Sequence, residues 1–367
     1  MNMSWGEFTG TLMQKAAELG VPIEGQFELT SRCNLRCNMC YLGRGANDAD
    51  AIKRERSAQE WIRLAAEARD AGMLYLLLTG GEVFIRNDFR EIYEAISKMG
   101  FNIMIYTNAT MITKDIADWL GHIPPSQVEI TLYGASPEAY SYICGSSEAY
   151  TKAVQGIDLL LSRDITVSLK TTVVQGNADD FEKIAEFAQK RSIDFGVVNY
   201  VSPRREPGNT RPESERLSPE KLAEYEMRVQ NYLNKGNRKK TYSVFKADKP
   251  SVDVKEYPFY CTSGKCSFWI TWDGRMTPCG LMNEPATFPF EKGFDNAWEE
   301  LQEACCSLPV CTECDECSLQ DYCMSCIARL WSETGCYDRP ASYLCRHAQS
   351  RKALEEVLLT KYEENEI

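Results

Sequence analysis

Short apolar runs alternate with amphipathic stretches along residues 23–202. The runs have the length of strands buried in a parallel sheet, and the stretches repeat their apolar residues at helical spacing. This alternation predicts βα units around a parallel sheet, and hence the α/β fold class. Six strands are expected, at residues 23–29, 74–79, 102–106, 127–132, 165–172 and 195–200. Six units are too few for a closed eight-stranded barrel.

Helices are expected between these strands, at residues 57–71, 88–99, 113–120, 150–162 and 179–191. Ser57 and Thr113 stand at N-cap positions, where a hydroxyl accepts a hydrogen bond from a free backbone N–H. An N-terminal helical segment, residues 1–22, is expected from apolar residues at helical spacing: Trp5, Phe8, Leu12, Ala16 and Leu19. This segment would cover one end of the sheet, or alternatively dock a partner.

The composition changes after residue 202. Residues 203–257 are rich in Pro, Arg, Glu, Lys and Asn, and are expected to form a linker with one helix, residues 219–233, capped by Ser218. Within the linker, the charged loop 203–208 either closes over the mouth of the barrel or is a solvated connection. Two further segments are expected, a Cys-rich domain at residues 258–350 and a charged helix or tail at residues 351–367.

Composition and charge narrow the class of protein. The chain has 367 residues, more than one ordinary domain, and its net charge of −12 disfavours nucleic acid as a partner. Its longest apolar runs fall far short of the roughly 20 residues needed to cross a bilayer. No signal peptide is evident at the N-terminus, so we expect a cytoplasmic protein without a membrane partner. Its 16 Cys then indicate metal ligation or redox work rather than disulfides.

The sequence contains only two His residues, which leaves little material for imidazole-based zinc catalysis or for a Ser-His-Asp triad. His122 stands at a probable helix end and is expected to be a C-terminal cap. His347 lies in the charged C-terminal segment and is expected to be solvated.

Cys33, Cys37 and Cys40 stand close together just after the first expected strand. Three thiolates at this spacing can hold three irons of a four-iron cluster. Such clusters are normally closed by four Cys, but the next Cys along the chain is Cys144. A small molecule would therefore complete the site at the open iron. The alternative is zinc with a distant fourth ligand.

The triplet resembles the signature of the radical S-adenosyl-L-methionine (SAM) enzymes, with Met39 at the apolar position before its third Cys. Gly80, Gly81 and Glu82 follow the second expected strand, as the family's Gly-Gly-Glu motif does, where it contacts the SAM amino group. The resemblance implies a partial (β/α)6 barrel. It also implies SAM bound to a [4Fe–4S] cluster, which cleaves it to a 5′-deoxyadenosyl radical that takes a hydrogen atom from the substrate.

Other strand ends are candidates for contacts with SAM, because the reactive groups of βα barrels gather at the carboxyl ends of strands. In the family, polar side chains at these positions meet the ribose and carboxylate of SAM. The resemblance points to Thr107, Asn108, Thr131 and Lys170. The alternative is that these residues simply decorate loops. Val197 and Val198 would pack against adenine or fill a buried strand.

The last third of the chain contains a second pattern of Cys residues, around an expected hairpin that turns at Asp273-Gly274. It resembles the SPASM domain of peptide-modifying radical SAM enzymes, which holds two auxiliary [4Fe–4S] clusters. The resemblance assigns Cys261, Cys266, Cys279 and Cys326 to the inner cluster, and Cys314, Cys317, Cys323 and Cys345 to the outer one. The alternative is a pair of structural zinc sites.

Two departures from the family pattern leave parts of this assignment open. Only two residues separate Cys323 from Cys326, where the common pattern has three, and Cys311 adds a further Cys-x2-Cys step. Cys311 or Cys336 could replace an assigned ligand. Four Cys receive no role and are expected to behave as small apolar residues: Cys144, Cys305, Cys306 and Cys336.

The resemblance implies oxidative modification of a ribosomally made peptide, giving a cross-link, a thioether or a double bond, with the auxiliary clusters accepting an electron. Enzymes of the family that mature sulfatases carry an Asp general base where this chain has Gly280, which disfavours that activity. Only 32 residues precede Cys33, too few for a winged-helix leader-binding module. The expected partners are therefore a precursor peptide, a separate leader-binding protein, and an electron donor such as flavodoxin or ferredoxin. The alternatives are a radical SAM dehydrogenase of a small molecule and a non-enzymatic electron-transfer or zinc scaffold.

Overall fold

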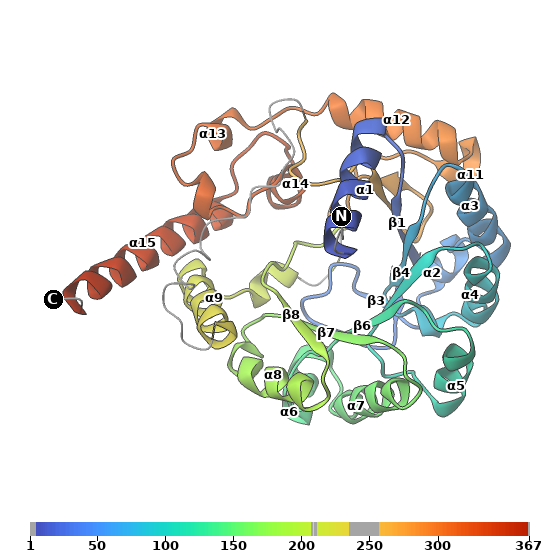
Figure 1. The fold of residues 1–367 in the computed structure, drawn as a ribbon, viewed down its shortest axis with the longest axis horizontal. Coiled ribbons are helices and arrows are strands. Elements are labelled where there is room, and N and C mark those ends of the chain that lie inside the picture. The colour runs from blue at the N-terminus through green and yellow to red at the C-terminus, as the bar shows by residue number, and fades with distance from the viewer. Residues whose placement is uncertain (1–4, 207, 209–210, 235–256, 366–367) are drawn as a thin grey trace.

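The computed structural model describes residues 5–206, 208, 211–234 and 257–365. Its centre is an eight-stranded sheet in the order β10-β9-β1-β4-β5-β6-β7-β8 (Figure 1). The strands of this sheet are β1 (Glu24–Thr30), β4 (Tyr75–Gly80), β5 (Asn102–Thr107), β6 (Gln127–Thr131), β7 (Val167–Thr172), β8 (Asp194–Val198), β9 (Ser267–Ile270) and β10 (Met276–Thr277). A separate two-stranded sheet pairs β2 (Arg32–Cys33) with β3 (Arg44–Gly45).

Helices surround the sheet in an arc (Figure 1). Those of the first two thirds of the chain are α1 (Trp5–Leu19), α2 (Ala49–Arg54), α3 (Ala58–Asp70), α4 (Phe89–Ser97), α5 (Lys114–His122), α6 (Pro137–Cys144), α7 (Glu148–Leu161), α8 (Phe181–Lys190) and α9 (Pro219–Leu233). Those of the last third are α11 (Pro289–Lys292), α12 (Phe294–Cys306), α13 (Thr312–Asp315), α14 (Ile327–Thr334) and α15 (Ser342–Asn365). Short 3-10 turns lie at Val83–Ile85, Ala178–Asp180, Pro212–Glu215 and Gln320–Tyr322.

The six predicted strands are confirmed as β1 and β4 to β8, and their bounds shift by only one or two residues. The ladders between them are parallel throughout, as expected for βα units. The predicted caps are also confirmed. Ser57 forms a capping box with Glu60 at the start of α3, and the hydroxyls of Thr113 and Ser218 cap α5 and α9. Helix α6, capped by Ser136, was not predicted.

The predicted hairpin forms as β9 and β10, but it belongs to the central sheet. β9 pairs in parallel with β1, and β10 pairs antiparallel with β9. The apolar side chains of β9 explain this position: Phe268 is fully buried between Phe27 of β1 and both Phe294 and Trp298 of α12. An open β1 edge would otherwise expose unpaired backbone groups. The last third of the chain thus completes the sheet that the first third begins.

Helix α15 packs along α9, and a buried polar group joins them. Arg351 of α15 donates two hydrogen bonds to Glu226 of α9, both at 2.7 Å, and the Nε2 of His347 lies 3.1 Å from the same carboxylate. His347 is fully buried, so the prediction that it is solvated is wrong. The residues around it in the sequence are mostly charged, and they do not indicate that this face of α15 contacts the carboxylate of Glu226. His122 does end α5, with its Nδ1 2.6 Å from the carbonyl of Asp118.

Part of the expected linker lies outside the described residues, namely 207, 209–210 and 235–256, as do residues 366–367 of the expected tail. Of the linker residues described, 219–233 form the predicted helix. Among the helices that the structure describes, none has an apolar stretch long enough to cross a bilayer.

Candidate active site

The Cys triplet lies on the loop that leaves β1 at its carboxyl end. Backbone amides of the loop point at two of its sulfurs: the N–H of Leu35 donates to the Sγ of Cys33 (3.4 Å), and that of Gly43 to the Sγ of Cys40 (3.2 Å). Burial raises the pKa of the Cys33 and Cys40 thiols, so without a bound cation both stay protonated at neutral pH. Iron binding would supply the charge that holds them as thiolates.

A cavity of about 800 Å³ opens inside the sheet beneath this loop. Its volume lies within the range of small-molecule and cofactor sites. The triplet lines it together with most of the residues expected to contact SAM: Met39, Gly80, Gly81, Thr107, Asn108, Thr131 and Lys170. The donor set and the space therefore fit a SAM-binding cluster. The individual SAM contacts stay predictions.

The Gly80-Gly81 pair fastens the Cys loop to β4. The N–H of Gly81 donates to the carbonyl of Thr30 (2.8 Å), and the N–H of Glu82 to that of Arg32 (2.9 Å). A Cβ on either glycine would lie 2.3 Å from one of these carbonyl oxygens, and Gly80 has a φ of +150°. Only glycine allows the two backbones to approach so closely.

Glu82 is buried behind the cavity wall. Its carboxylate accepts hydrogen bonds from the hydroxyl of Thr107 (2.8 and 2.9 Å) and from the backbone N–H of Asn108 (2.8 Å). Burial raises its pKa to about 7, although these hydrogen bonds oppose the shift. The side chain of Asn108 continues the chain of contacts, because its Nδ2 lies 3.6 Å from the Sγ of Cys33. Residues 75 positions apart in the sequence thus meet at the first Cys of the triplet.

Lys170 lines the cavity, but its ammonium already has partners. It lies 2.5 Å from a carboxylate oxygen of Glu129 and 3.3 Å from the ring centre of Tyr106. Burial lowers the pKa of Lys170, and Glu129 partly opposes that shift. The two valines of β8 differ: Val198 lines the cavity and is 39% exposed, whereas Val197 packs against a separate apolar cluster.

Cys144 is a neighbour of the triplet that sequence reasoning missed. It is buried at the end of α6, where its thiol is hydrogen-bonded to Cys37 and raises the pKa of that thiol. The backbone of α6 also fixes the loop, since the N–H of Arg36 donates to the carbonyl of Cys144 (3.1 Å). A lone apolar Cys in a helix carries no signal for this contact.

The C-terminal cysteines fall into two neighbourhoods. Burial raises the pKa of Cys279 to about 12, and the nearby thiols of Cys326 and Cys261 add to that shift; Cys261 acts in the same way on Cys266. Cys279 also lines the cavity. The structure therefore brings the expected inner ligands close to one another and beside the candidate active site.

The second neighbourhood contains the expected outer ligands and one more thiol. Cys314 lies within electrostatic range of Cys323 and Cys345, and Cys317 lies within range of Cys345. Cys311 is buried and hydrogen-bonded to Cys314. Across the described residues, no three His, Cys, Asp or Glu side chains are arranged to hold a single metal ion. Both ligand sets stay predictions.

The family description "Radical SAM superfamily" matches residues 27–188, which carry the Cys triplet and the Gly80-Gly81-Glu82 turn. The chain contains a radical SAM domain. It is accordingly an enzyme, and SAM and a [4Fe–4S] cluster are its cofactors.

Three similarities extend beyond this domain. The AdoMet-dependent heme synthase of Methanosarcina barkeri is 25% identical over 345 residues, which are 89% of this chain and 97% of that protein. The sporulation killing factor maturation protein SkfB of Bacillus subtilis is 24% identical over 72% of this chain, and the match spans 62% of SkfB. The structure of Streptococcus suis SuiB bound to S-adenosylmethionine superposes with a TM-score of 0.69 at 18% identity, covering 93% of this chain and 83% of SuiB.

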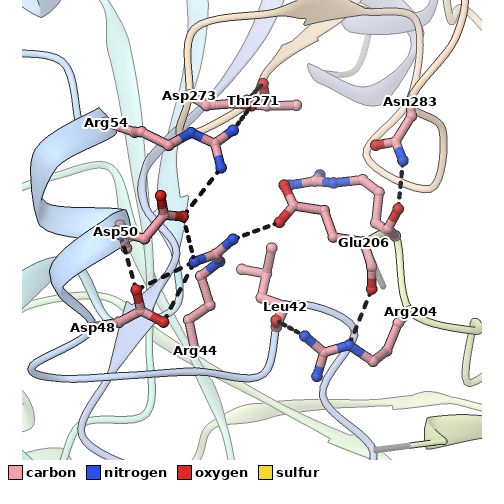
Figure 2. Close-up of polar contacts among 12 residues, drawn as sticks. Leu42, Arg44, Asp48, Asp50, Arg54, Arg204, Glu206, Thr271, Asp273 and Asn283 are labelled. Carbon is pink, nitrogen blue, oxygen red and sulfur yellow. Dashed lines mark hydrogen bonds and ion pairs between the residues drawn. The ribbon is translucent and has the colours of Figure 1, made fainter. Parts of the chain in front are cut away.

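A strap formed by Arg204, Arg205 and Glu206 crosses from the radical SAM domain to the C-terminal third. Arg204 donates to the carbonyl of Leu42 (2.7 Å), and Glu206 pairs with Arg44 (2.9 Å), as Figure 2 shows. The prediction for this loop left open whether it closes over the mouth or is solvated. These three residues are anchored, and Arg205 is 5% exposed.

A charged group next to the strap links α2 to the hairpin turn. Arg54 of α2 pairs with Asp273 at 2.7 Å, and Asp50 bridges Arg54 and Arg44 (Figure 2). The guanidinium groups of Arg44 and Arg54 lie 4.9 and 4.5 Å from the ring of buried Trp272. The hairpin turn is therefore held to the segment that follows the Cys triplet.

Proposed function

We propose that this enzyme oxidatively modifies an unactivated carbon of a ribosomally made precursor peptide. The observation that carries the proposal is the single cavity that reaches from Cys33, Cys37 and Cys40 to Cys279. It lets a substrate side chain lie between the catalytic cluster and an electron acceptor. The similarity to SkfB, a maturation protein for a killing factor, supports a peptide substrate, as does the fold shared with SuiB, which has a structure with precursor peptide SuiA.

When bound at the open iron, SAM supplies a 5′-deoxyadenosyl radical that removes a hydrogen atom from the substrate. The chain's own residues prepare this step. Gly81 and Glu82 hold the Cys loop against β4, and Thr107 and Asn108 fix the Glu82 carboxylate beneath it. We propose that the Gly80-Gly81-Glu82 turn binds the SAM amino group, with Gly80 and Gly81 facing the cavity, and that Thr131 and Lys170 meet the ribose or carboxylate of SAM.

We propose that two auxiliary [4Fe–4S] clusters complete the enzyme and take the second electron of the oxidation. The inner would be held by Cys261, Cys266, Cys279 and Cys326, and the outer by Cys314, Cys317, Cys323 and Cys345. The neighbourhoods of these thiols support this division. None of the chain's 16 Cys forms a disulfide in the structure, which suits work in the reducing cytoplasm.

Sulfatase maturation is disfavoured, because the residue after Cys279 is Gly280, which has no side chain to act as a general base. A Cβ on Gly280 would lie 2.9 Å from the ring of Trp269. The indole thus fills the space that a side chain at this position would need. We propose instead that the precursor peptide is presented by a separate leader-binding protein, and that a flavodoxin or ferredoxin supplies electrons.

A second candidate is oxidation of a small molecule. It is favoured by the similarity to the heme synthase, which spans nearly the whole length of both chains. Incubating the reconstituted enzyme with SAM and reductant, first with a precursor peptide and then with a tetrapyrrole, separates the two proposals. Formation of 5′-deoxyadenosine should depend on the added molecule only for the class of substrate that the enzyme modifies.

Cluster content is tested by measuring iron, labile sulfide and zinc per chain after anaerobic reconstitution. About twelve irons are expected, and about eight in a Cys33→Ala/Cys37→Ala/Cys40→Ala variant, at four irons per cluster. The Cys33→Ala variant should form no 5′-deoxyadenosine. About four irons together with zinc would show that the C-terminal thiolates are structural, and the oxidative mechanism would lose its electron acceptor.

A further inference from the structure

Arg205 and Glu28 form a charge pair sealed inside the molecule. Their side chains are 1% and 0% exposed, and the guanidinium hydrogen-bonds directly to the carboxylate. The same carboxylate accepts hydrogen bonds from the hydroxyl of Tyr41 and the backbone N–H of Trp272, both at 3.2 Å. β1, the Cys loop, the strap and the C-terminal hairpin therefore converge on one buried group.

Arg205 also contacts the residue that follows a cysteine on each side. Its backbone N–H donates to the carbonyl of Tyr41 (3.3 Å), which comes directly after Cys40. Its Nη1 donates to the carbonyl of Gly280 (3.1 Å), which comes directly after Cys279. One side chain and its own backbone thus join the turn of the catalytic triplet to the turn of an expected inner ligand.

Further contacts hold Arg205 in this position. Asn283, from the C-terminal third, donates to the carbonyl of Arg205. On either side, Arg204 bonds to Leu42 and Glu206 pairs with Arg44. A buried charge pair is costly unless its geometry is held well and its remaining bonds are satisfied. The surrounding contacts meet this requirement for the carboxylate of Glu28 and for both terminal nitrogens of Arg205, whereas the buried Nε of Arg205 has no hydrogen-bond partner.

We propose that Arg205 is a positioning residue for the electron-transfer step, fixing the separation between the catalytic and inner auxiliary clusters. This rests on the proposed function. After hydrogen abstraction, the substrate radical loses one electron and one proton: the electron reduces the inner cluster by one unit, and the proton passes to water. An electron-carrier protein later reoxidises that cluster. The radical would form beside the catalytic cluster and its electron would pass to the inner one. Because electron tunnelling slows steeply with distance, the Cys40 and Cys279 turns must keep a fixed spacing.

The test compares Arg205→Gln, Arg205→Lys and wild-type holoenzyme. Two quantities are measured: the peptide product formed per 5′-deoxyadenosine, and the magnetic interaction between the reduced catalytic and inner clusters, by EPR relaxation. In Arg205→Gln, we expect SAM cleavage to continue while the product ratio falls by about tenfold, as for a small misplacement of reacting groups. The magnetic interaction should change with it. Arg205→Lys should restore part of both.

Arg216→Gln is the matched control. Arg216 is also a buried guanidinium, and it pairs with Glu333 and donates to the carbonyl of Val201, but it contacts neither Cys turn. This variant should lose stability and keep the wild-type product ratio and magnetic interaction. An unchanged magnetic interaction in Arg205→Gln would overturn the proposal, as would equal uncoupling in Arg216→Gln.

Glu28→Gln/Arg205→Gln covers the case in which the single variant does not fold, because it leaves no unpaired buried charge. It should show the same uncoupling and the same altered cluster interaction. If wild-type enzyme modifies no peptide at all, the proposed function fails. The magnetic measurement needs no substrate, and it then still decides whether Arg205 sets the spacing.

Discussion

At the scale of single residues, the wall of the cavity next to Cys279 depends on Gly280, which has no side chain. Gly280 lies against the face of Trp269, and any larger residue would have to displace the indole. Gly280 also offers no side chain that could act as a base beside Cys279. Trp269 gives the cavity an aromatic surface there instead.

Gly280→Ala should therefore destabilise the protein by about 1–3 kcal/mol, the usual cost of overpacking a filled site. Denaturant unfolding measures the loss. Gly10→Ala is the control, because an added Cβ there meets no atom within 4 Å, and alanine favours a helix such as α1. A Gly280→Ala/Trp269→Leu variant should recover part of the loss. Equal stability of Gly280→Ala and wild type would contradict the packing argument.

Glu82 gives a pH dependence whose sign follows from its burial. Its pKa rises from the usual 4.5 to about 7, so between these values the native state binds more protons than the unfolded chain. Its contribution to stability is fully present below pH 4.5 and is lost as the pH rises through about 7. Cluster-free wild type should lose up to about 3 kcal/mol of unfolding free energy across this window from this group alone.

Glu82→Gln should remove that part of the pH dependence, measured by denaturant unfolding at several pH values between 5 and 8. Glu148→Gln is a suitable control because Glu148 lies exposed on α7, and it should keep the wild-type slope. If Glu82→Gln and wild type lose stability in parallel as the pH rises, burial does not raise the pKa of this carboxyl.

At the scale of elements, α9 and α15 are joined through the carboxylate of Glu226. Burial opposes its ionisation, but the hydrogen bonds from His347 and Arg351 hold its pKa below the usual range. The charged form is thus the stable one, and it depends on partners that approach from the other helix. Tyr343 adds a contact between α15 and the segment before α9, since its hydroxyl donates to the carbonyl of Leu217 (3.1 Å).

Glu226→Gln should cost about 3–5 kcal/mol, the range for breaking a buried ion pair from one side. The midpoint of denaturant unfolding reports the change. Lys352→Ala, on the solvent side of the same helix, should shift stability by no more than about 0.5 kcal/mol. Similar effects of the two substitutions would show that the buried carboxylate of Glu226 does not stabilise the packing of α9 against α15.

The sequence predicts those features that leave a local pattern. The alternating runs locate the six parallel strands, Ser57 and Ser218 mark helix starts, and the Cys spacing marks the catalytic loop. The sequence does not predict contacts between residues that lie far apart along the chain. Glu28 and Arg205 are 177 positions apart, and neither neighbourhood shows that the other exists. His347 was misjudged for the same reason, because its partner lies on another element. Cys144 is buried in the core as predicted, but its contact with Cys37 was missed.

At the scale of the whole molecule, one sheet joins the first and last thirds of the chain. β1 is flanked by β4 on one side and by β9 on the other, and residues of both thirds share one hydrophobic core at this junction. Phe268 fills the junction between Phe27 and the ring of Phe294. The loop with the Cys triplet and the Cys-rich segment are therefore positioned by strands of the same sheet.

The two parts should accordingly unfold together. Tryptophan fluorescence and far-UV circular dichroism should give coincident transitions, and Phe268→Ala should move both to lower denaturant, with a loss of about 3–5 kcal/mol. Phe8→Ala, an exposed position on α1, should leave both transitions nearly unmoved. Separate transitions for the barrel and the C-terminal third would show that the sheet does not couple them.

The position of β1 between β4 and β9 also orders events during synthesis. A ribosome makes β1 well before the neighbour that closes its other edge, Ser267–Ile270, leaves the exit tunnel. The loop with Cys33, Cys37 and Cys40 stays without its final support until then. Iron should therefore enter the catalytic site only after residues 267–270 have left the tunnel, and a nascent chain stalled before residue 267 should not hold a cluster.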